Sequence, residues 1–208
     1  MASDAADTSL VAILRGVLPE RVVEISEVLF DAGIRAIEVP LNSTEPLTSI
    51  AKLAARRSDW TVGAGTVLNA DDVRRTHEAG GRLIVAPNCN TEVIREALKL
   101  GMRVMPGVAS ATEAFAAIGA GARQLKLFPA VTYGPRHLEA LRAVLPRDVG
   151  VYPVGGVAPQ DIARWLAAGA AGFGFGSELF RADYSIADIG RRARDLVQTL
   201  REARAQTP

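Results

Sequence analysis

A short unit recurs along this chain: a helix-like segment, then a glycine, then a brief apolar run of the kind that forms a strand. Glycine just past the end of a helix is the usual C-cap residue, so each copy marks a helix that passes into a strand. The unit occurs at residues 31–34, 78–81, 99–102, 120–122 and 168–170. The chain is therefore expected to alternate helices with strands.

Eight apolar runs are the expected strands. Because they are almost continuously apolar, they are typical of parallel strands buried on both faces. They span residues 10–15, 34–39, 61–65, 82–86, 102–106, 122–127, 150–154 and 171–175. Eight such units without a linker predict one α/β domain, a closed (β/α)8 (TIM) barrel over residues 1–208. The chain is short for that fold, so its loops must be tight, and residues 1–8 are expected to form a frayed tail.

The alternative fold is an open, doubly wound parallel sheet. Its dinucleotide-binding form carries Gly-x-Gly-x-x-Gly after the first strand, and that motif does not follow residues 10–15. Polar residues that can cap helices precede several of the intervening segments. The expected caps are Ser110 with Glu113, Ser185 with Asp188, Asn69 and Asn90.

The charge and cysteine content exclude several classes of function. A net charge of +1 gives no overall field that would draw the chain to nucleic acid or to an anionic membrane, so an anionic ligand must be held by local groups. A single cysteine, Cys89, excludes an intrachain disulfide, and two distant histidines disfavour a metal site. The chain has neither the pattern of a signal peptide nor an apolar stretch that spans a bilayer, so we expect a cytoplasmic protein.

Lys126 is the one lysine placed inside an apolar strand. Lys52 and Lys99, in contrast, fall in helix-like segments that water can reach. Burial disfavours an ammonium, and the neutral lysine amine is the nucleophile that attacks a carbonyl to give a Schiff base. The alternative is a lysine whose amine extends from the strand end to water.

Other polar residues also stand where apolar runs end. In a barrel, the loops after the carboxyl ends of the strands meet at one mouth. Arg15, Glu38 and Thr66 lie at the ends of the first three strands, and Lys126 closes the sixth. We expect these four side chains to converge, because barrel interiors seldom bury three charges without a function. Taken singly, Glu38 and Arg15 could form a structural ion pair, and Thr66 could cap a turn.

These four side chains suit carbon–carbon bond cleavage through an imine. Lys126 would attack a 2-keto acid, and the protonated imine would stabilise the carbanion left when the C3–C4 bond breaks. Glu38 would take the proton of the C4 hydroxyl and return one to C3, directly or through a water. Arg15 would favour the neutral amine by charge repulsion and hold the substrate carboxylate, to which Thr66 could add a hydrogen bond.

Two glycine-rich stretches follow the seventh and eighth strands, at residues 154–157 and 174–177. Glycines let backbone amides approach an anion, and the loops after these strands are the recurrent phosphate site of the fold. Ser177 lies where a short helix could point its positive end inward. These loops therefore predict a phosphate site built from amides, and the alternative is a pair of tight turns.

Five motifs give the chain a specific resemblance to the 2-keto-3-deoxy-6-phosphogluconate/phosphogalactonate aldolase family. They are Leu14-Arg15-Gly16, Ile37-Glu38-Val39-Pro40-Leu41-Asn42-Ser43, Gly63-Ala64-Gly65-Thr66-Val67, Leu125-Lys126-Leu127-Phe128-Pro129 and Gly155-Gly156-Val157. The resemblance covers nearly the whole chain and implies a (β/α)8 barrel, commonly a homotrimer. It also implies an enzyme that splits a phosphorylated 2-keto-3-deoxy sugar acid into pyruvate and glyceraldehyde 3-phosphate without a metal or an organic cofactor.

The same resemblance assigns roles to single residues. It implies Lys126 as the Schiff-base lysine and Glu38 as the acid and base, Arg15 and Thr66 at the substrate carboxylate, and Gly155, Gly156, Gly176 and Ser177 at the phosphate. The phosphogluconate branch usually has arginine in place of Asn42 and threonine in place of Val154. Asn42 and Val154 resemble the phosphogalactonate branch, whose substrate has the other configuration at C4, so we expect both residues to affect specificity.

Three other functions are compatible with these residues. A phosphogluconate or 4-hydroxy-2-oxoglutarate aldolase would use the same machinery. A phosphate-binding barrel isomerase would use Glu38 as a base and Lys126 only for its charge. A non-enzymatic module would bind a phosphorylated sugar without turnover.

Overall fold

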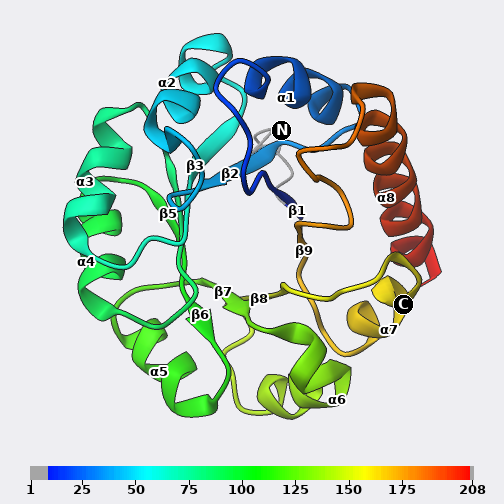
Figure 1. Cartoon of the computed structure of the whole chain (residues 1–208). Helices are drawn as coiled ribbons and strands as arrows, with labels where there is room; N and C mark the ends of the chain where they lie inside the picture. The colour runs from blue at the N-terminus through cyan, green and yellow to red at the C-terminus, as the bar shows by residue number, and fades with distance from the viewer. Residues whose placement is uncertain (1–8, 207–208) are drawn as a thin grey trace, which may run out of the picture.

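The computed structural model describes residues 9–206, in which eight α-helices surround nine parallel strands (Figure 1). The strands are β1 Leu10–Ile13, β2 Ala36–Pro40, β3 Thr61–Gly65, β4 Leu83–Val85, β5 Arg103–Met105, β6 Gly107–Val108, β7 Gln124–Leu127, β8 Gly150–Pro153 and β9 Phe173–Phe175. The helices are α1 Val22–Asp31, α2 Pro46–Arg56, α3 Ala70–Glu78, α4 Thr91–Lys99, α5 Ala111–Gly119, α6 Ala130–Arg142, α7 Ile162–Ala167 and α8 Ile186–Gln206, with a 3-10 turn η1 at Pro159–Asp161. The predicted alternation of helices and strands is confirmed; the predicted tail, residues 1–8, lies outside the described residues.

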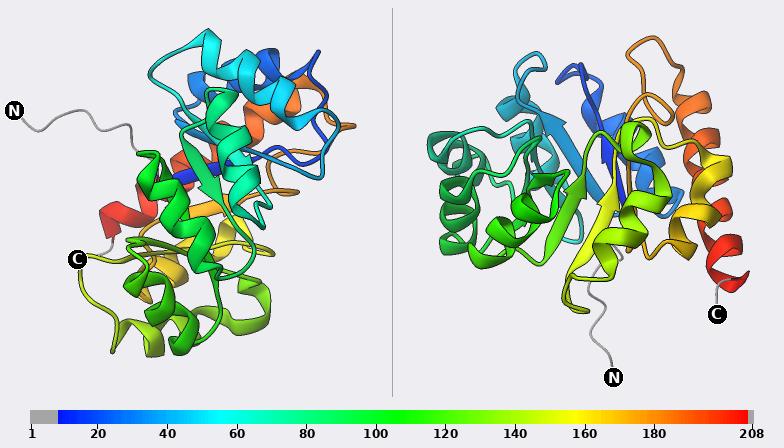
Figure 2. Two further views of the ribbon diagram at one scale, coloured as in Figure 1. Left: turned by 90° about the vertical axis from the view of Figure 1, so that its left-hand side faces the viewer. Right: turned by 90° about the horizontal axis from the view of Figure 1, so that it is seen from below.

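The strands form two curled parallel sheets. One runs in the order β5-β4-β3-β2-β1-β9 and the other in the order β6-β7-β8. A single parallel bridge, between Val154 and Gly174, joins β8 to β9, and the chain itself passes from β5 to β6 at Pro106. The prediction of a closed eight-stranded barrel is therefore met in part: the helices enclose the strands, but the hydrogen-bonded ladder is interrupted at two seams (Figures 1 and 2).

Pro106 explains the seam between β5 and β6. Proline has no N–H to donate to a ladder, so a strand is interrupted where it occurs. Its carbonyl oxygen accepts a hydrogen bond of 2.9 Å from the Lys126 backbone N–H. The chain therefore changes its partner from β4 to β7 at this residue: the strand expected at residues 102–106 is observed as β5, and the short strand β6 follows Pro106.

Each of the eight predicted runs corresponds to an observed strand whose ends differ from the predicted ends by at most two residues, and one further strand, β6, was not predicted. The predicted caps are also confirmed. Ser110 and Glu113 form a reciprocal capping box, and the Ser185 hydroxyl accepts a hydrogen bond from the Asp188 N–H. The side chains of Asn69 and Asn90 accept hydrogen bonds from the first turns of α3 and α4.

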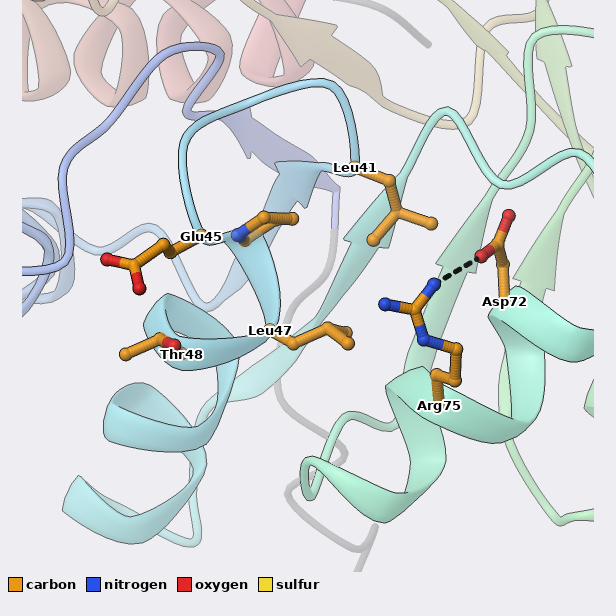
Figure 3. Close-up of a pocket in the computed structure, with 7 residues that line it drawn as sticks. Leu41, Glu45, Leu47, Thr48, Asp72 and Arg75 are labelled. Atoms are coloured by element: carbon orange, nitrogen blue, oxygen red, sulfur yellow. Dashed lines mark hydrogen bonds and ion pairs between the residues drawn. The ribbon is translucent and has the colours of Figure 1, made fainter.

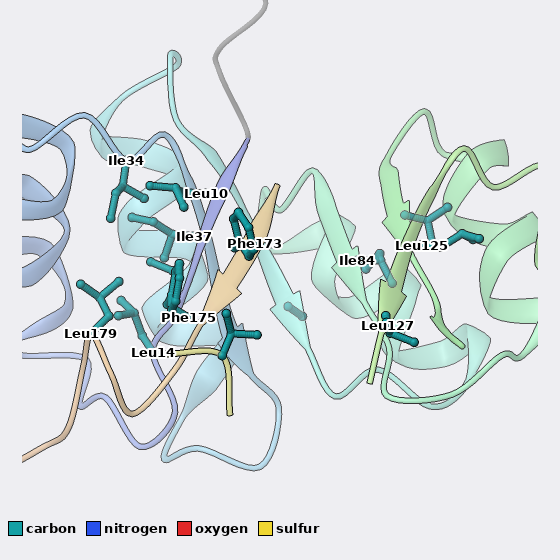
Figure 4. Packing of buried hydrophobic residues seen from close by; sticks show 14 of the residues in the cluster. Leu10, Leu14, Ile34, Ile37, Ile84, Leu125, Leu127, Phe173, Phe175 and Leu179 are labelled. Atoms are coloured by element: carbon teal, nitrogen blue, oxygen red, sulfur yellow. The ribbon is translucent and has the colours of Figure 1, made fainter. Parts of the chain in front are cut away.

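Two clusters of buried side chains lie on opposite faces of the strands. The larger one packs the strands against the helices and includes Leu10, Leu125 and Phe173 (Figure 4). The smaller one contains Val11 and Ala36 and lies on the face that the helices do not cover, because successive strand residues point to opposite sides. Glu38 follows Ala36 by two residues and therefore shares this inner face.

None of the helices described here combines the length and the apolar character needed to cross a membrane.

Candidate active site

Lys126 lies on the inner face of β7, since its neighbours Leu125 and Leu127 belong to the outer cluster. Its side chain is only 5% exposed, so it is not a lysine that extends into bulk water. Its amine lies 4.7 Å from the centre of the Phe128 ring. Burial lowers the pKa of Lys126; the charge of Glu38 acts to raise this pKa, and the charge of Arg15 acts to lower it further. The site therefore increases the neutral, nucleophilic fraction of this amine relative to an exposed lysine.

Glu38 lies on the inner face of β2 and is 1% exposed. Burial raises its pKa to about 7, against the opposing influence of the Lys126 and Arg15 charges. Within the described residues, its Oε2 atom is buried and has no hydrogen-bond partner. A carboxylate with this pKa and an unused oxygen can both accept and return a proton near neutral pH.

A cavity of about 260 Å3 opens beside Lys126 at the carboxyl ends of the strands. Eight of the ten predicted site residues line it, and they come from five different strand ends: Arg15, Thr66, Lys126, Val154, Gly155, Gly156, Gly176 and Ser177. Glu38 is buried on the inner face of the strands and its charge acts on the pKa of Lys126, but it does not line the cavity. Asn42 stands at the exposed rim. The structure therefore brings together residues that lie more than 160 positions apart in the sequence.

Thr66 adopts a left-handed backbone conformation with φ of 57°. A β-branched residue in this region is strained, and such strain is found mainly at functional sites. Thr66 follows β3 directly and lines the cavity, so the strained residue lies at the candidate site. Its predicted contact with the substrate carboxylate stays a prediction.

Arg15 does not form the ion pair with Glu38 that the sequence left open. Its guanidinium donates a hydrogen bond of 2.5 Å to Asn42 Oδ1, and no ion pair within residues 9–206 includes it. Because Arg15 lines the cavity and remains exposed, its positive charge is available to an anionic ligand.

The Gly155-Gly156 pair lets the loop after β8 lie against the start of α6. Both residues have positive φ, at 90° and 73°. A Cβ atom on Gly156 would lie 2.6 Å from Val131 Cβ, and one on Gly155 would lie 3.1 Å from the Phe128 ring. The N–H of Val131 donates a hydrogen bond to the Gly155 carbonyl, which fixes this approach.

The loop after β9 is a hydrogen-bonded turn, so the expectation of a short helix at Ser177 is wrong. The N–H groups of Leu179 and Phe180 both donate to the Gly176 carbonyl, and the chain then continues as an irregular loop to α8. The Ser177 hydroxyl donates a hydrogen bond of 3.5 Å to the carboxylate of Glu178, and both residues line the cavity. Ser177 therefore lies at the cavity without a helix behind it.

The cavity also contains residues that were not predicted from the sequence. They are Ile13, Pro87, Phe128, Val157, Gly174, Phe175 and Glu178. Most are apolar and carry no chemical signal of their own. Their positions at strand ends could have indicated them, since Ile13 precedes Arg15 by two residues and Phe128 follows Lys126 by two.

A second cavity, of about 380 Å3, lies between α2, α3 and the loop after β2 (Figure 3). Leu41 and Leu47 face Arg75, which is paired with Asp72. None of the predicted site residues lines it. Within the described residues, no group of three or more His, Cys, Asp or Glu side chains is arranged to hold a metal ion.

Comparison with known proteins places this site in a family. The chain matches the family model described as KDPG and KHG aldolase over residues 2–191. The 2-dehydro-3-deoxy-6-phosphogalactonate aldolase of Escherichia coli K12 is 46% identical over 195 residues, which cover 93% of this chain and 95% of that protein. A solved structure of native KDPGal is similar with a TM-score of 0.92 and 45% identity, over 94% of this chain and 96% of the other. KDPG aldolase from Legionella pneumophila, with pyruvate captured at low pH as a covalent carbinolamine intermediate, is similar with a TM-score of 0.81 and 25% identity, over 95% of both chains.

The α/β fold with its curled parallel sheets, together with these relatives, identifies the chain as an enzyme of the aldolase type. The chain belongs to the KDPG and KHG aldolase family.

Proposed function

We propose that this protein is a class I aldolase that cleaves 2-dehydro-3-deoxy-6-phospho-D-galactonate to pyruvate and D-glyceraldehyde 3-phosphate. The observation that carries the proposal is the placement of a buried lysine and a buried glutamate beside one cavity that ends in two glycine loops. The covalent pyruvate adduct of the Legionella relative and the name of the Escherichia coli relative support it.

The proposed reaction begins at Lys126. Its neutral amine adds to the C2 carbonyl of the substrate, and loss of water gives a protonated imine. Glu38 takes the proton of the C4 hydroxyl as the C3–C4 bond breaks; the bonding electrons move into the imine, and glyceraldehyde 3-phosphate leaves. The resulting enamine is protonated at C3 by the carboxyl group of Glu38, and water then hydrolyses the imine to release pyruvate and the free amine.

We expect the two ends of the substrate to be held by different groups of residues. Arg15 and Thr66 would hold the carboxylate beside Lys126, since a guanidinium forms strong charge-assisted hydrogen bonds with carboxylates. Gly155, Gly156, Gly176 and Ser177 would hold the phosphate through backbone amides and one hydroxyl. Val154 lines the same cavity, which supports the expectation that it affects selectivity for the C4 configuration.

The decisive experiment measures pyruvate release from the two C4-epimeric substrates, 2-keto-3-deoxy-6-phosphogalactonate and the phosphogluconate compound. We expect a clear preference for the galactonate epimer. Equal rates would support the aldolase mechanism but would show that Asn42 and Val154 do not determine specificity. The alternative would then be a phosphogluconate or 4-hydroxy-2-oxoglutarate aldolase. No pyruvate from either substrate would favour the isomerase or the binding module.

A second experiment tests the covalent step. Borohydride reduction in the presence of pyruvate should attach one pyruvate to Lys126, which peptide mapping by mass spectrometry would locate. Lys126→Ala should lose both the adduct and turnover, whereas Lys99→Ala, at an exposed position on α4, should keep both. Full activity in Lys126→Ala would contradict the mechanism.

The proposed function includes an oligomeric state and a closed barrel. We expect the two sheets to act as one (β/α)8 barrel and the protein to form a homotrimer, as the family resemblance implies. Sedimentation analysis should give the mass of three chains, and a monomer would remove this expectation without affecting the proposed chemistry.

A further inference from the structure

Two neighbouring loops are tied together at the rim of the cavity. Arg15, in the loop after β1, donates a hydrogen bond of 2.5 Å from its guanidinium to Asn42 Oδ1 in the loop after β2. The next residue on each loop repeats the contact, since the Gly16 N–H donates a hydrogen bond of 2.9 Å to Ser43 Oγ. Consecutive residues of one loop therefore hold consecutive residues of the other.

The surroundings of Arg15 give this contact a consequence. Arg15 lines the cavity at Lys126, and it also lines an adjoining cavity of about 440 Å3 that extends toward Phe180 and Arg181. Ile13, Gly176 and Ser177 line both cavities as well. A long, flexible arginine side chain without a restraint could extend into either space.

Asn42 itself lies outside the lining of the catalytic cavity that contains Lys126. It is exposed at the rim, and its acceptor oxygen is already used by Arg15. Its exchange for another residue therefore acts first on the guanidinium and only then on the ligand.

We propose that Asn42 and Ser43 form a clamp that holds the Arg15 guanidinium at the catalytic cavity, so that Asn42 affects substrate binding through Arg15. Asn42 is then a positioning residue. This inference rests on the proposed function, because the anion that Arg15 serves is the substrate carboxylate.

The clamp also affects the charge balance at Lys126. The groups whose charges act on this amine are Glu38 and Arg15, of which Arg15 favours the neutral form. If the guanidinium moves away, the amine becomes easier to protonate, so Schiff-base formation should need a higher pH.

The test compares Asn42→Ala with Thr44→Ala. Thr44 is an exposed residue of the same loop, and within the described residues its side chain makes no hydrogen bond. The first readout is borohydride trapping of pyruvate on the enzyme across pH and pyruvate concentration. Asn42→Ala should need roughly five- to tenfold more pyruvate for half-maximal trapping, and its pH midpoint should move upward. Thr44→Ala should behave as the wild type.

A double-variant cycle identifies the route of the effect. Arg15→Gln should show the same two changes, and adding Asn42→Ala to Arg15→Gln should change nothing further, because the clamp then has nothing to hold. Effects of the two substitutions that multiply in the double variant would overturn the proposal.

A measurement that does not depend on the aldolase chemistry distinguishes failure of the clamp from failure of the proposed function. The signal of the Arg15 Nη1 group, which donates to Asn42, should be distinct in 15N NMR spectra of the wild type and of Thr44→Ala, with Arg15→Gln used for its assignment. In Asn42→Ala it should move to the position of freely exposed arginines. An unchanged Arg15 signal in Asn42→Ala would overturn the clamp even if the aldolase reaction is established; a lost signal together with no pyruvate adduct in any variant would keep the clamp and overturn the proposed function.

Discussion

The carboxylate of Glu38 occupies the space that a side chain at position 65 would fill. A Cβ atom built on Gly65 would lie 1.6 Å from Glu38 Oε2, far closer than any real contact. The two residues lie on adjacent strands, and Gly65 pairs with Pro40, two residues beyond Glu38. The absent side chain of Gly65 is therefore what allows the acid and base to stand inside the sheet.

Gly65→Ala should reduce turnover without unfolding the protein. The atom that must move is the far end of the flexible Glu38 side chain, so the fold can accommodate the methyl group while the carboxylate leaves its position. Because general acid–base catalysis contributes about 100-fold or more, kcat should fall by roughly that factor. Steady-state kinetics and thermal melts would be measured together, with Gly119→Ala as the control because nothing lies within 4 Å of its Cβ position. Unchanged kcat in Gly65→Ala would show that catalysis does not require the Glu38 carboxylate at its present position.

Gly156→Ala should weaken binding of the phosphate end of the substrate. Its φ of 73° is unfavourable for alanine, and the new Cβ would meet Val131 at 2.6 Å, so the loop after β8 must move. We expect KM for the phosphorylated substrate to rise about tenfold, as for the loss of one or two hydrogen bonds to a charged group. Trapping of pyruvate, which has no phosphate, should be unchanged.

Gly101→Ala is the matched control for this variant. Its φ of 68° imposes the same backbone strain, but its Cβ would meet nothing within 4 Å. Both variants should lose about 1–2 kcal/mol of stability from the left-handed conformation. An equal rise of KM in both would mean that the effect comes from general destabilisation and not from the loop.

Much of the fold was predictable because parallel strands buried on both faces leave continuous apolar runs. The positions of Lys126 and Glu38 were predictable for a related reason: strand ends meet at one mouth whatever their order along the chain. The roles of these residues stay predictions, while the burial of both side chains and the place of Lys126 at the cavity are structural findings.

Other features of the site could not be predicted, because they depend on contacts between segments that are distant in the sequence. The hydrogen bond from Arg15 to Asn42 requires two irregular loops to lie side by side, and no pattern in either loop indicates it. The space that Gly65 leaves for Glu38 requires the register of two strands. The split at Pro106 did have a local signal, since proline cannot take part in a central ladder as a donor.

The rate of cleavage should increase with pH through the neutral range. Glu38, with a pKa raised to about 7, must be ionised to accept the hydroxyl proton, and the fraction of neutral Lys126 amine also increases with pH. The kcat/KM profile should therefore show an acid limb with an inflection near neutral pH. The residual activity of Glu38→Gln should lack that inflection. A wild-type profile that stays flat through this range would exclude Glu38 as the base.

Glu38→Gln should make the protein more stable above neutral pH. A folded-state pKa of about 7, raised from 4.5, means that the folded protein retains a proton which the unfolded chain releases. Stability is therefore highest below the unfolded pKa and falls as pH rises through about 7, by up to roughly 3 kcal/mol for a shift of this size. Glutamine cannot ionise, so the variant does not lose this stability as the pH rises. The pKa of Lys126 is shifted in the opposite direction, but Lys126 is present in both proteins.

Urea denaturation at about pH 5 and about pH 8 would measure this difference. The gain in Glu38→Gln should be large at the higher pH and small at the lower one, and Glu20→Gln, at an exposed position, controls for the loss of one surface charge. A gain that is equal at both pH values would assign the effect to packing and not to the buried charge. The expected outcome, a more stable and nearly inactive protein, would show that the strand carrying Glu38 sacrifices stability in order to hold a carboxylate beside Lys126.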